Sequence, residues 1–188
     1  MRRLLTAACV LAVAFTAGVI APASLAEDEP QPAPITVTGG DIGEYLLDDI
    51  TAARKETWRW ERLMRMPYSQ TSRSAERSNE AAHRRWVLKM WKQKAALRKR
   101  QANHPPRLGA WLCINRFEGR WTDPNAPYYG GLQMDIAFQR TYAPELLRKK
   151  GTADKWTPVE QIWVAERAYR SGRGFTPWPN TARSCGLL

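Results

Sequence analysis

The sequence predicts a mainly helical protein with one short β element. Apolar residues recur at helical spacing over residues 41–60 and 75–101. The run Thr157-Pro158-Val159-Glu160 is a capping box with proline at the first helical position, which is typical of the start of a helix. Two tyrosines and two glycines follow one another at 128–131, and we expect a short strand or hairpin over residues 128–132.

Residues 1–26 have the pattern of a secretion signal. Arg2 and Arg3 form a basic start, residues 4–20 form an apolar stretch, and Ser24-Leu25-Ala26 is a small-residue cleavage site. We therefore expect a secreted protein, extracellular or in the cell wall, cut after residue 26. A membrane anchor is the alternative reading, but the apolar stretch is short for a spanning helix.

Charge is distributed unevenly over the rest of the chain. Residues 27–40 read as a Pro-rich acidic leader, and residues 27–50 together carry seven acids and no bases. Residues 51–106 carry fifteen bases and four acids, a net charge of +11. A basic exported protein is attracted to polyanions such as wall phosphates, anionic glycans and membrane surfaces.

Residues 41–106 are interpreted as a basic helical region, which the Asn103–Pro106 run closes. The simplest reading is a helical hairpin that packs its aromatic residues on itself or on the domain that follows. In the second helix, 75–101, the apolar face is expected to hold Trp86, Val87, Met90, Trp91, Ala95 and Leu97. The alternative is binding of anionic wall polymers or a membrane surface by 75–101. Nucleic acid is not an expected partner, because export removes it.

The C-terminal part, residues 107–188, also reads mostly as helices. Helices are expected over 106–117, 135–142, 144–150 and 157–169. The expected core residues of the first and last of these are Leu108, Trp111, Leu112, Ile114, Val159, Ile162, Trp163 and Tyr169. Glu166, on the same face as Ile162, is interpreted as a structural acid paired with an arginine.

The segment 113–133 contains the residue that we expect to be catalytic. It reads Cys-Ile-Asn-Arg-Phe-Glu-Gly-Arg-Trp, then a polar turn, then Tyr-Tyr-Gly-Gly-Leu-Gln. Its carboxylate, Glu118, is expected at a helix end, because Gly119 follows it and glycine is the common residue past a helix end. A carboxyl group among aromatic residues has its charged form disfavoured and can act as a general acid. Cleavage of a glycosidic bond needs such an acid.

Several pieces occur in a characteristic order. They are Cys113, Glu118-Gly119, Trp121, Tyr128 to Gln133, Ala165-Glu166-Arg167, Trp178-Pro179 and Cys185. This order resembles the transglycosylase-like and resuscitation-promoting-factor-like domains of the lysozyme-like superfamily, over about residues 107–188. In the resuscitation factors the glutamate directly follows the cysteine, whereas here five positions separate the two. The sequence is therefore nearer the broader transglycosylase-like branch.

The resemblance implies an α+β lysozyme-like fold, mainly helical with a short β element. It also implies cleavage of peptidoglycan between N-acetylmuramic acid and N-acetylglucosamine, with Glu118 as the single catalytic residue. The residues it places in the substrate cleft are Trp121, Tyr128, Tyr129, Gly130, Gly131 and Gln133. Each has a structural alternative, since the aromatics can be core residues and the glycines plain turn residues. The resemblance implies no cofactor.

A second carboxylate would favour hydrolysis by water over lytic transglycosylation. The candidates are Asp123, in a turn, Asp135, whose alternative role is to cap the next helix, and Asp154. Hydrolysis, as by a muramidase, stays an alternative, and so does a non-catalytic wall-binding or signalling module that keeps the cleft without turnover.

The cysteines point to one disulfide. Removal of the signal would remove Cys9 and leave Cys113 and Cys185 in an oxidising compartment. A bond between them is expected to close most of the C-terminal domain into one loop. The two histidines, His83 and His104, lie outside that domain, and we expect no metal site.

Overall fold

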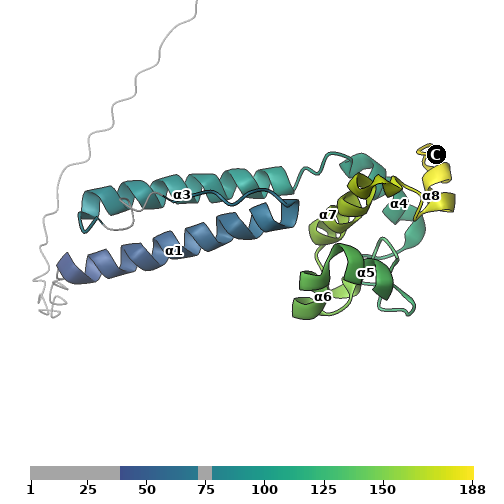
Figure 1. Cartoon of the computed structure of the whole chain (residues 1–188), viewed down its shortest axis with the longest axis horizontal. Coiled ribbons are helices and arrows are strands. Elements are labelled where there is room, and N and C mark those ends of the chain that lie inside the picture. The colour runs from purple at the N-terminus through teal and green to yellow at the C-terminus, as the bar shows by residue number, and fades with distance from the viewer. Residues whose placement is uncertain (1–38, 72–77) are drawn as a thin grey trace, which may run out of the picture. The chain divides into compact units, whose positions relative to one another are not determined.

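The computed structural model describes residues 39–71 and 78–188 (Figure 1). The secretion signal predicted for 1–26, and most of the leader predicted for 27–40, lie outside the described residues. Within the described part of the chain, no helix combines the length and apolar character that crossing a membrane requires.

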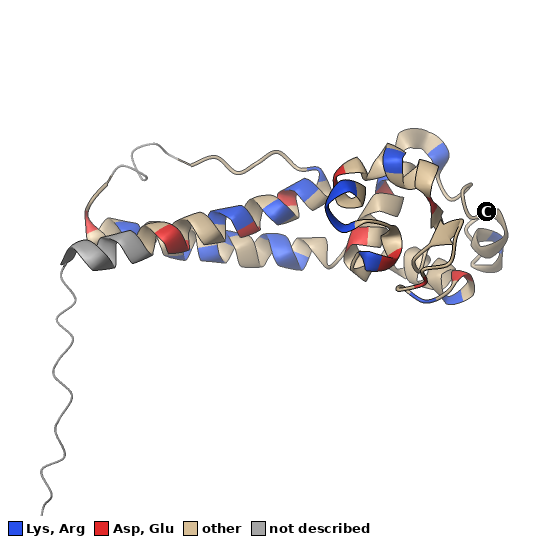
Figure 2. Ribbon diagram, turned by 90° about the horizontal axis from the view of Figure 1, so that it is seen from below, with Lys and Arg blue, Asp and Glu red and all other residues tan. Residues whose placement is uncertain are grey.

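The basic region contains two long helices that lie side by side (Figure 1). Helix α1 spans Gly39–Met64 and helix α3 spans Ala81–Ala102, so α3 begins later than the 75 expected from the sequence. A small apolar cluster of Ile50, Val87 and Trp91 joins the two helices. Figure 2 shows Lys and Arg spread along α3 and along the coloured part of α1.

The buried side chain of Glu61 connects α1 to α3 and to the segment after α1 near the end of this helix pair. Its side chain is fully buried on α1, and its carboxylate accepts hydrogen bonds from the Ser69 backbone N–H at 2.8 Å and hydroxyl at 2.6 Å. It also pairs with Arg98 of α3 at 2.9 Å. Burial acts to raise the pKa of Glu61, but these hydrogen bonds outweigh burial and lower the pKa. The glutamate is therefore ionised and satisfied at neutral pH.

The C-terminal part is mainly helical with one small sheet, which confirms that level of the fold prediction. The elements are α4 (Leu108–Glu118), β1 (Tyr128–Tyr129), β2 (Met134–Asp135), α5 (Ile136–Tyr142), α6 (Pro144–Lys150), a 3₁₀ turn (Ala153–Lys155), α7 (Pro158–Ala168), a π-helical turn (Tyr169–Arg173) and α8 (Pro179–Ser184). The two strands pair antiparallel, with Tyr128 opposite Asp135.

Helix α7 forms the centre of this part. The capping box predicted at its start is present, with Thr157 and Glu160 each accepting from the other's backbone N–H. Every residue from Glu160 to Ala168 is buried. Glu166 is among them and accepts from Trp111 Nε1 at 2.8 Å and from Arg107 at 2.6 Å. Its arginine pairing agrees with the structural role expected from the sequence.

Two hydrogen bonds connect the helix pair to α7. Trp163 Nε1 donates to the carbonyl of Ala102 at 2.7 Å, and Arg167 Nη2 donates to the carbonyl of Leu63 at 2.9 Å. Leu63, Met64 and Ala102 also form a buried apolar cluster with Trp163. The last turns of both long helices are thereby held against the same face of α7.

Several expected core positions are corrected by the structure. Leu112 is 47% exposed, because α4 turns that face away from the cluster around Trp111 and Ile114. On α3, Trp86 and Leu97 are exposed, since only one narrow side of this helix contacts α1. The remaining partial cases are half-buried: Leu108, Met90, Val159 and Tyr169 pack on buried residues, and Ala95 is half-buried as well.

Candidate functional site

Glu118 is the last residue of α4 and is half-buried. The helix ends there because Gly119 adopts φ +145°, a backbone conformation that favours glycine. The Glu118 Oε1 atom accepts a hydrogen bond of 2.7 Å from the hydroxyl of Thr181 on α8. The carboxylate therefore lies at the junction of α4 and α8.

A disulfide between Cys113 and Cys185 joins the same two helices. Cys113 lies in α4 five residues before Glu118, and Cys185 follows α8 four residues after Thr181. The covalent link and the Thr181–Glu118 hydrogen bond thus act between the same pair of elements.

The turn between the two strands is hydrogen-bonded to the side chain of Gln161 on α7. The backbone N–H of Gly131 donates to Gln161 Oε1 at 2.9 Å. The Gln161 amide nitrogen donates in turn to the carbonyls of Trp121 and Ala153, at 2.8 and 2.9 Å. A Cβ at Gly130 would fall within 3.0 Å of this amide, so the turn requires glycine there.

Asn115 connects this turn to the end of α4. Its side-chain nitrogen donates to the carbonyl of Gly119 at 2.7 Å and to that of Gly131 at 2.8 Å. Gly119 also lies beside Gln133, since a Cβ added there would be 3.6 Å from Gln133 Nε2. The end of α4, at Gly119 directly after Glu118, therefore lies beside Gly131 and Gln133.

A pocket of about 300 Å³ adjoins this place. It is lined by Tyr128, Gln133, Met134, Asp135, Ala137, Phe138, Thr141, Arg173, Pro177 and Trp178. Gln133 lies beside Gly119, and the carbonyl of Trp178 is 3.4 Å from the Thr181 hydroxyl that binds Glu118. Glu118 does not itself line this pocket; it is connected to the pocket wall through Gly119, which lies beside Gln133, and through Thr181, which lies beside Trp178.

The aromatic residues predicted for the cleft differ in exposure. Tyr128 is 50% exposed and lines the pocket. Trp121 packs its ring against Gly131, where an added Cβ would lie 2.7 Å from it, and Tyr129 packs against the core. Tyr128 is therefore the aromatic side chain of this group best exposed to a ligand.

Two of the candidate second carboxylates, Asp123 and Asp135, are engaged. Asp135 caps α5 and accepts from the Phe138 backbone N–H at 2.6 Å. Asp123 accepts from Gln133 Nε2 at 3.0 Å and from the amide groups of Asn125. Asp123 is close to the end of α4, since its Oδ2 lies 3.7 Å from where a Cβ of Gly119 would be.

Three residues of this site were missed by sequence reasoning: Asn115, Gln161 and Thr181. Asn115 stands one helical turn before Glu118, and that spacing was the available signal. Thr181 stands one turn before Cys185, so the expected disulfide could have placed it near α4. Gln161 carried no signal, because a glutamine within an apolar helix pattern is not distinctive.

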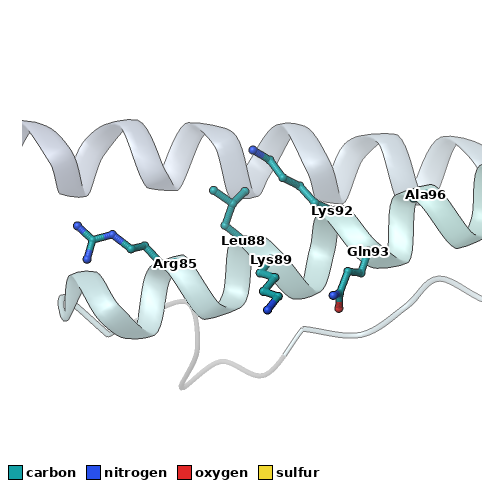
Figure 3. Close-up of a pocket in the computed structure, with 6 residues that line it drawn as sticks. All are labelled: Arg85, Leu88, Lys89, Lys92, Gln93 and Ala96. Carbon is teal, nitrogen blue, oxygen red and sulfur yellow. The ribbon is translucent and has the colours of Figure 1, made fainter. Parts of the chain in front are cut away.

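The basic surface of α3 is shallow. Its depression is lined by Arg85, Leu88, Lys89, Lys92, Gln93 and Ala96. Figure 3 shows Leu88 and Lys92 pointing toward α1, while Lys89 and Gln93 point away from it. Lys92 also lies 3.7 Å from Asp49 of α1. The surface offers spread positive charge and no enclosed site for a small ligand.

Among the described residues, no group of three His, Cys, Asp or Glu side chains could hold a metal ion. Comparison of the chain with protein-family models, with curated proteins and with solved structures finds no significant match.

Proposed function

We propose that the protein is an exported enzyme that cleaves the glycan strands of peptidoglycan, as a lytic transglycosylase with Glu118 as its acid and base. The observation that carries the proposal is the position of this carboxylate. It is half-buried at a helix end and accepts a hydrogen bond from Thr181, and its neighbours Gly119 and Thr181 adjoin two residues, Gln133 and Trp178, that line a pocket of about 300 Å³. Binding pockets of small ligands commonly have this size.

The chemistry follows from a single acid. Glu118 donates its proton to the oxygen of the bond between N-acetylmuramic acid and N-acetylglucosamine, and that bond breaks. The ionised carboxylate then takes the proton of the muramic acid 6-hydroxyl, whose oxygen attacks the anomeric carbon. The product is a 1,6-anhydro sugar, and no water is consumed.

The engaged state of Asp123 and Asp135 supports transglycosylation over hydrolysis. Inverting hydrolysis needs a second carboxylate that activates water. Asp135 is occupied as a helix cap and Asp123 is occupied by Gln133 and Asn125. A sugar hydroxyl as nucleophile removes the need for a second free carboxylate.

The basic helix pair suits a location in the cell wall. Residues 51–106 carry a net charge of +11, and Figure 2 shows this charge along the two helices. Such a surface would attract anionic wall polymers or a membrane surface without a specific pocket. This role is secondary to the cleavage proposed for the C-terminal part.

The test is incubation of the protein with purified peptidoglycan, followed by mass spectrometry of the soluble products. Glu118→Gln should reduce product formation at least about 100-fold, the usual range for loss of a general acid. Glu80→Gln is the matched control, because Glu80 is exposed and its side chain makes no capping hydrogen bond. This control should retain activity.

The products distinguish the alternatives. Anhydro fragments absent with Glu118→Gln would support the transglycosylase. Fragments with reducing ends would show hydrolysis and direct attention to Asp123. If neither protein releases fragments while both bind peptidoglycan equally, the enzyme proposal is wrong and a wall-binding module takes its place.

A further inference from the structure

Three arginines from three different parts of the fold line one recess of about 200 Å³. Arg65 follows α1, Arg167 belongs to α7, and Arg170 lies in the π-helical turn. The other residues that line the recess are Met64, Trp163 and Ser171. No acidic side chain lines it, so its three charged groups all have the same sign.

Arg167 is a buried cation without a carboxylate partner among the described residues. It is only 8% exposed, and its guanidinium donates to two backbone carbonyls, Tyr142 O at 2.8 Å and Leu63 O at 2.9 Å. Its Nε is buried and has no hydrogen-bond partner among the described residues. In the same part of the chain, no carboxylate lies within 4.0 Å of this guanidinium. A buried charge is normally paired with an opposite charge.

The neighbouring arginines add to the uncompensated positive charge at Arg167. Burial and, to a smaller extent, repulsion from Arg65 lower the pKa of Arg167 to about 10, although Glu145 acts in the opposite direction. Arg167 is therefore still protonated at neutral pH. Arg170 is 3.7 Å from Glu166, but that carboxylate also accepts a shorter bond of 2.6 Å from Arg107. Glu166 consequently compensates little of the charge in the recess.

Arg65 occupies a position where glycine would be preferred. It has φ +53°, and the following Met66 N–H donates back to the carbonyl of Glu61 at 2.8 Å, which closes α1 in a Schellman motif. Glycine takes this conformation without steric cost, whereas arginine does not. A cation at this strained position has an evident use if its guanidinium serves a ligand.

We propose that this recess binds a phosphate group, with Arg65, Arg167 and Arg170 as its cationic ligands. Arginine matches phosphate because its planar donors can pair with two oxygens at once. Three cations suit a doubly charged phosphate better than a single carboxylate. The buried Trp163 and Met64 form an apolar side wall, against which the carbon part of a phosphorylated sugar or a lipid headgroup would lie.

The experiment measures the melting temperature and the heat of binding of the full chain with inorganic phosphate, at constant ionic strength set by chloride. The test variant is Arg65→Gly. It should melt no lower than the wild type, because glycine relieves the strained backbone, yet bind phosphate at least tenfold more weakly. Arg100→Gln, an exposed charge on α3 outside the recess, is the matched control and should bind as the wild type does.

A second variant guards against effects of the backbone at residue 65. Arg170→Gln removes an exposed cation from the same recess and should also weaken phosphate binding at least tenfold. The proposal is wrong if phosphate does not bind saturably, or if Arg100→Gln weakens binding as much as the two recess variants do. The latter result would mean general attraction by net charge.

The source of the phosphate group is distinguished by further probes. Glucose 6-phosphate should bind at least as tightly as inorganic phosphate if the ligand is a phosphorylated sugar, and glucose should not bind. Vesicles with phosphatidic acid that sediment wild-type protein but not Arg65→Gly would identify a lipid headgroup instead. These measurements do not depend on glycan cleavage, so failure of either proposal leaves the other testable.

Discussion

The hydroxyl of Thr181 can orient Glu118 in both of its protonation states. It donates to Glu118 Oε1 at 2.7 Å, which suits an ionised carboxylate. It also has a second acceptor in reach, the carbonyl of Trp178 at 3.4 Å. When Glu118 carries the proton, the hydroxyl can turn to Trp178 and accept from the carboxyl group instead. An acid that must both give and take a proton would keep its position throughout.

We therefore expect Thr181 to be a positioning residue. Thr181→Val should lower kcat for fragment release about tenfold or more, because a hydrogen bond to a charged group contributes about 1.5–3 kcal/mol. KM should change little, since Thr181 does not line the pocket. Thr181→Ser keeps the hydroxyl and should restore most of kcat. Equal kcat for the valine and wild-type proteins would remove this role.

At this scale the sequence indicates the proposed acid but not its hydrogen-bond partner. Glu118 is recognisable because Gly119 follows it and tyrosines and glycines lie nearby. Thr181 is 63 residues away and has no local signature. The same holds for the amide of Gln161, whose partners, Gly131 and Trp121, lie 30 and 40 residues away. Contacts across such separations depend on tertiary packing, which local patterns do not encode.

At the scale of elements, the end of the helix pair depends on an ionised Glu61. The pKa of Glu61 is lowered from its ordinary value of 4.5, and that of Glu160, held by Lys150 and Thr157, is lowered as well. A group with a lowered pKa in the folded state stabilises the fold above its unfolded pKa, and that stabilisation is lost as pH falls through the folded pKa. Both glutamates therefore act in the same direction.

We expect the free energy of unfolding to be steady from neutral pH to about 5 and to fall below pH 4.5. Glu61→Gln should lower it by about 1–3 kcal/mol at pH 7, because Ser69 and Arg98 lose a charged acceptor. Its deficit relative to wild type should shrink toward pH 3. Denaturant unfolding followed by circular dichroism measures both effects, with Glu80→Gln as the control. A deficit that is the same at both pH values would contradict the linkage.

Elements with strong local signals are those that the sequence predicts best. Helix α6 spans the predicted residues 144–150, beginning at Pro144 and ending before Gly151. Helix α7 begins at its predicted capping box. The start of α3 differs, since no capping side chain marks it and Glu80 makes no cap hydrogen bond. Trp86 shows the limit of periodicity: it belongs to the apolar pattern, but no other element in the described part of the chain buries it, and it is 58% exposed.

At the scale of the molecule, hydrogen bonds join the helix pair to the C-terminal part, and a disulfide joins two helices within that part. The helix pair is joined to α7 through Trp163 and Arg167. The C-terminal helix α8 is joined to α4 by the disulfide, which spans 72 residues, and by the hydrogen bond from Thr181 to Glu118. The disulfide therefore encloses the candidate site, including the turn and the pocket, in one closed loop.

Reduction of this disulfide should affect both stability and the site. Closure of a loop of this length stabilises the folded state by roughly 4 kcal/mol through the entropy of the unfolded chain, so we expect a fall in the melting temperature of several degrees or more. Freed from Cys113, helix α8 would hold Thr181 against Glu118 less firmly, and fragment release should fall at temperatures well below melting. A Cys113→Ala/Cys185→Ala protein should show both deficits and no further response to reductant. If complete reduction, verified by thiol titration, changes neither the melting temperature nor the rate, packing alone positions α8 and the covalent link contributes nothing to the site.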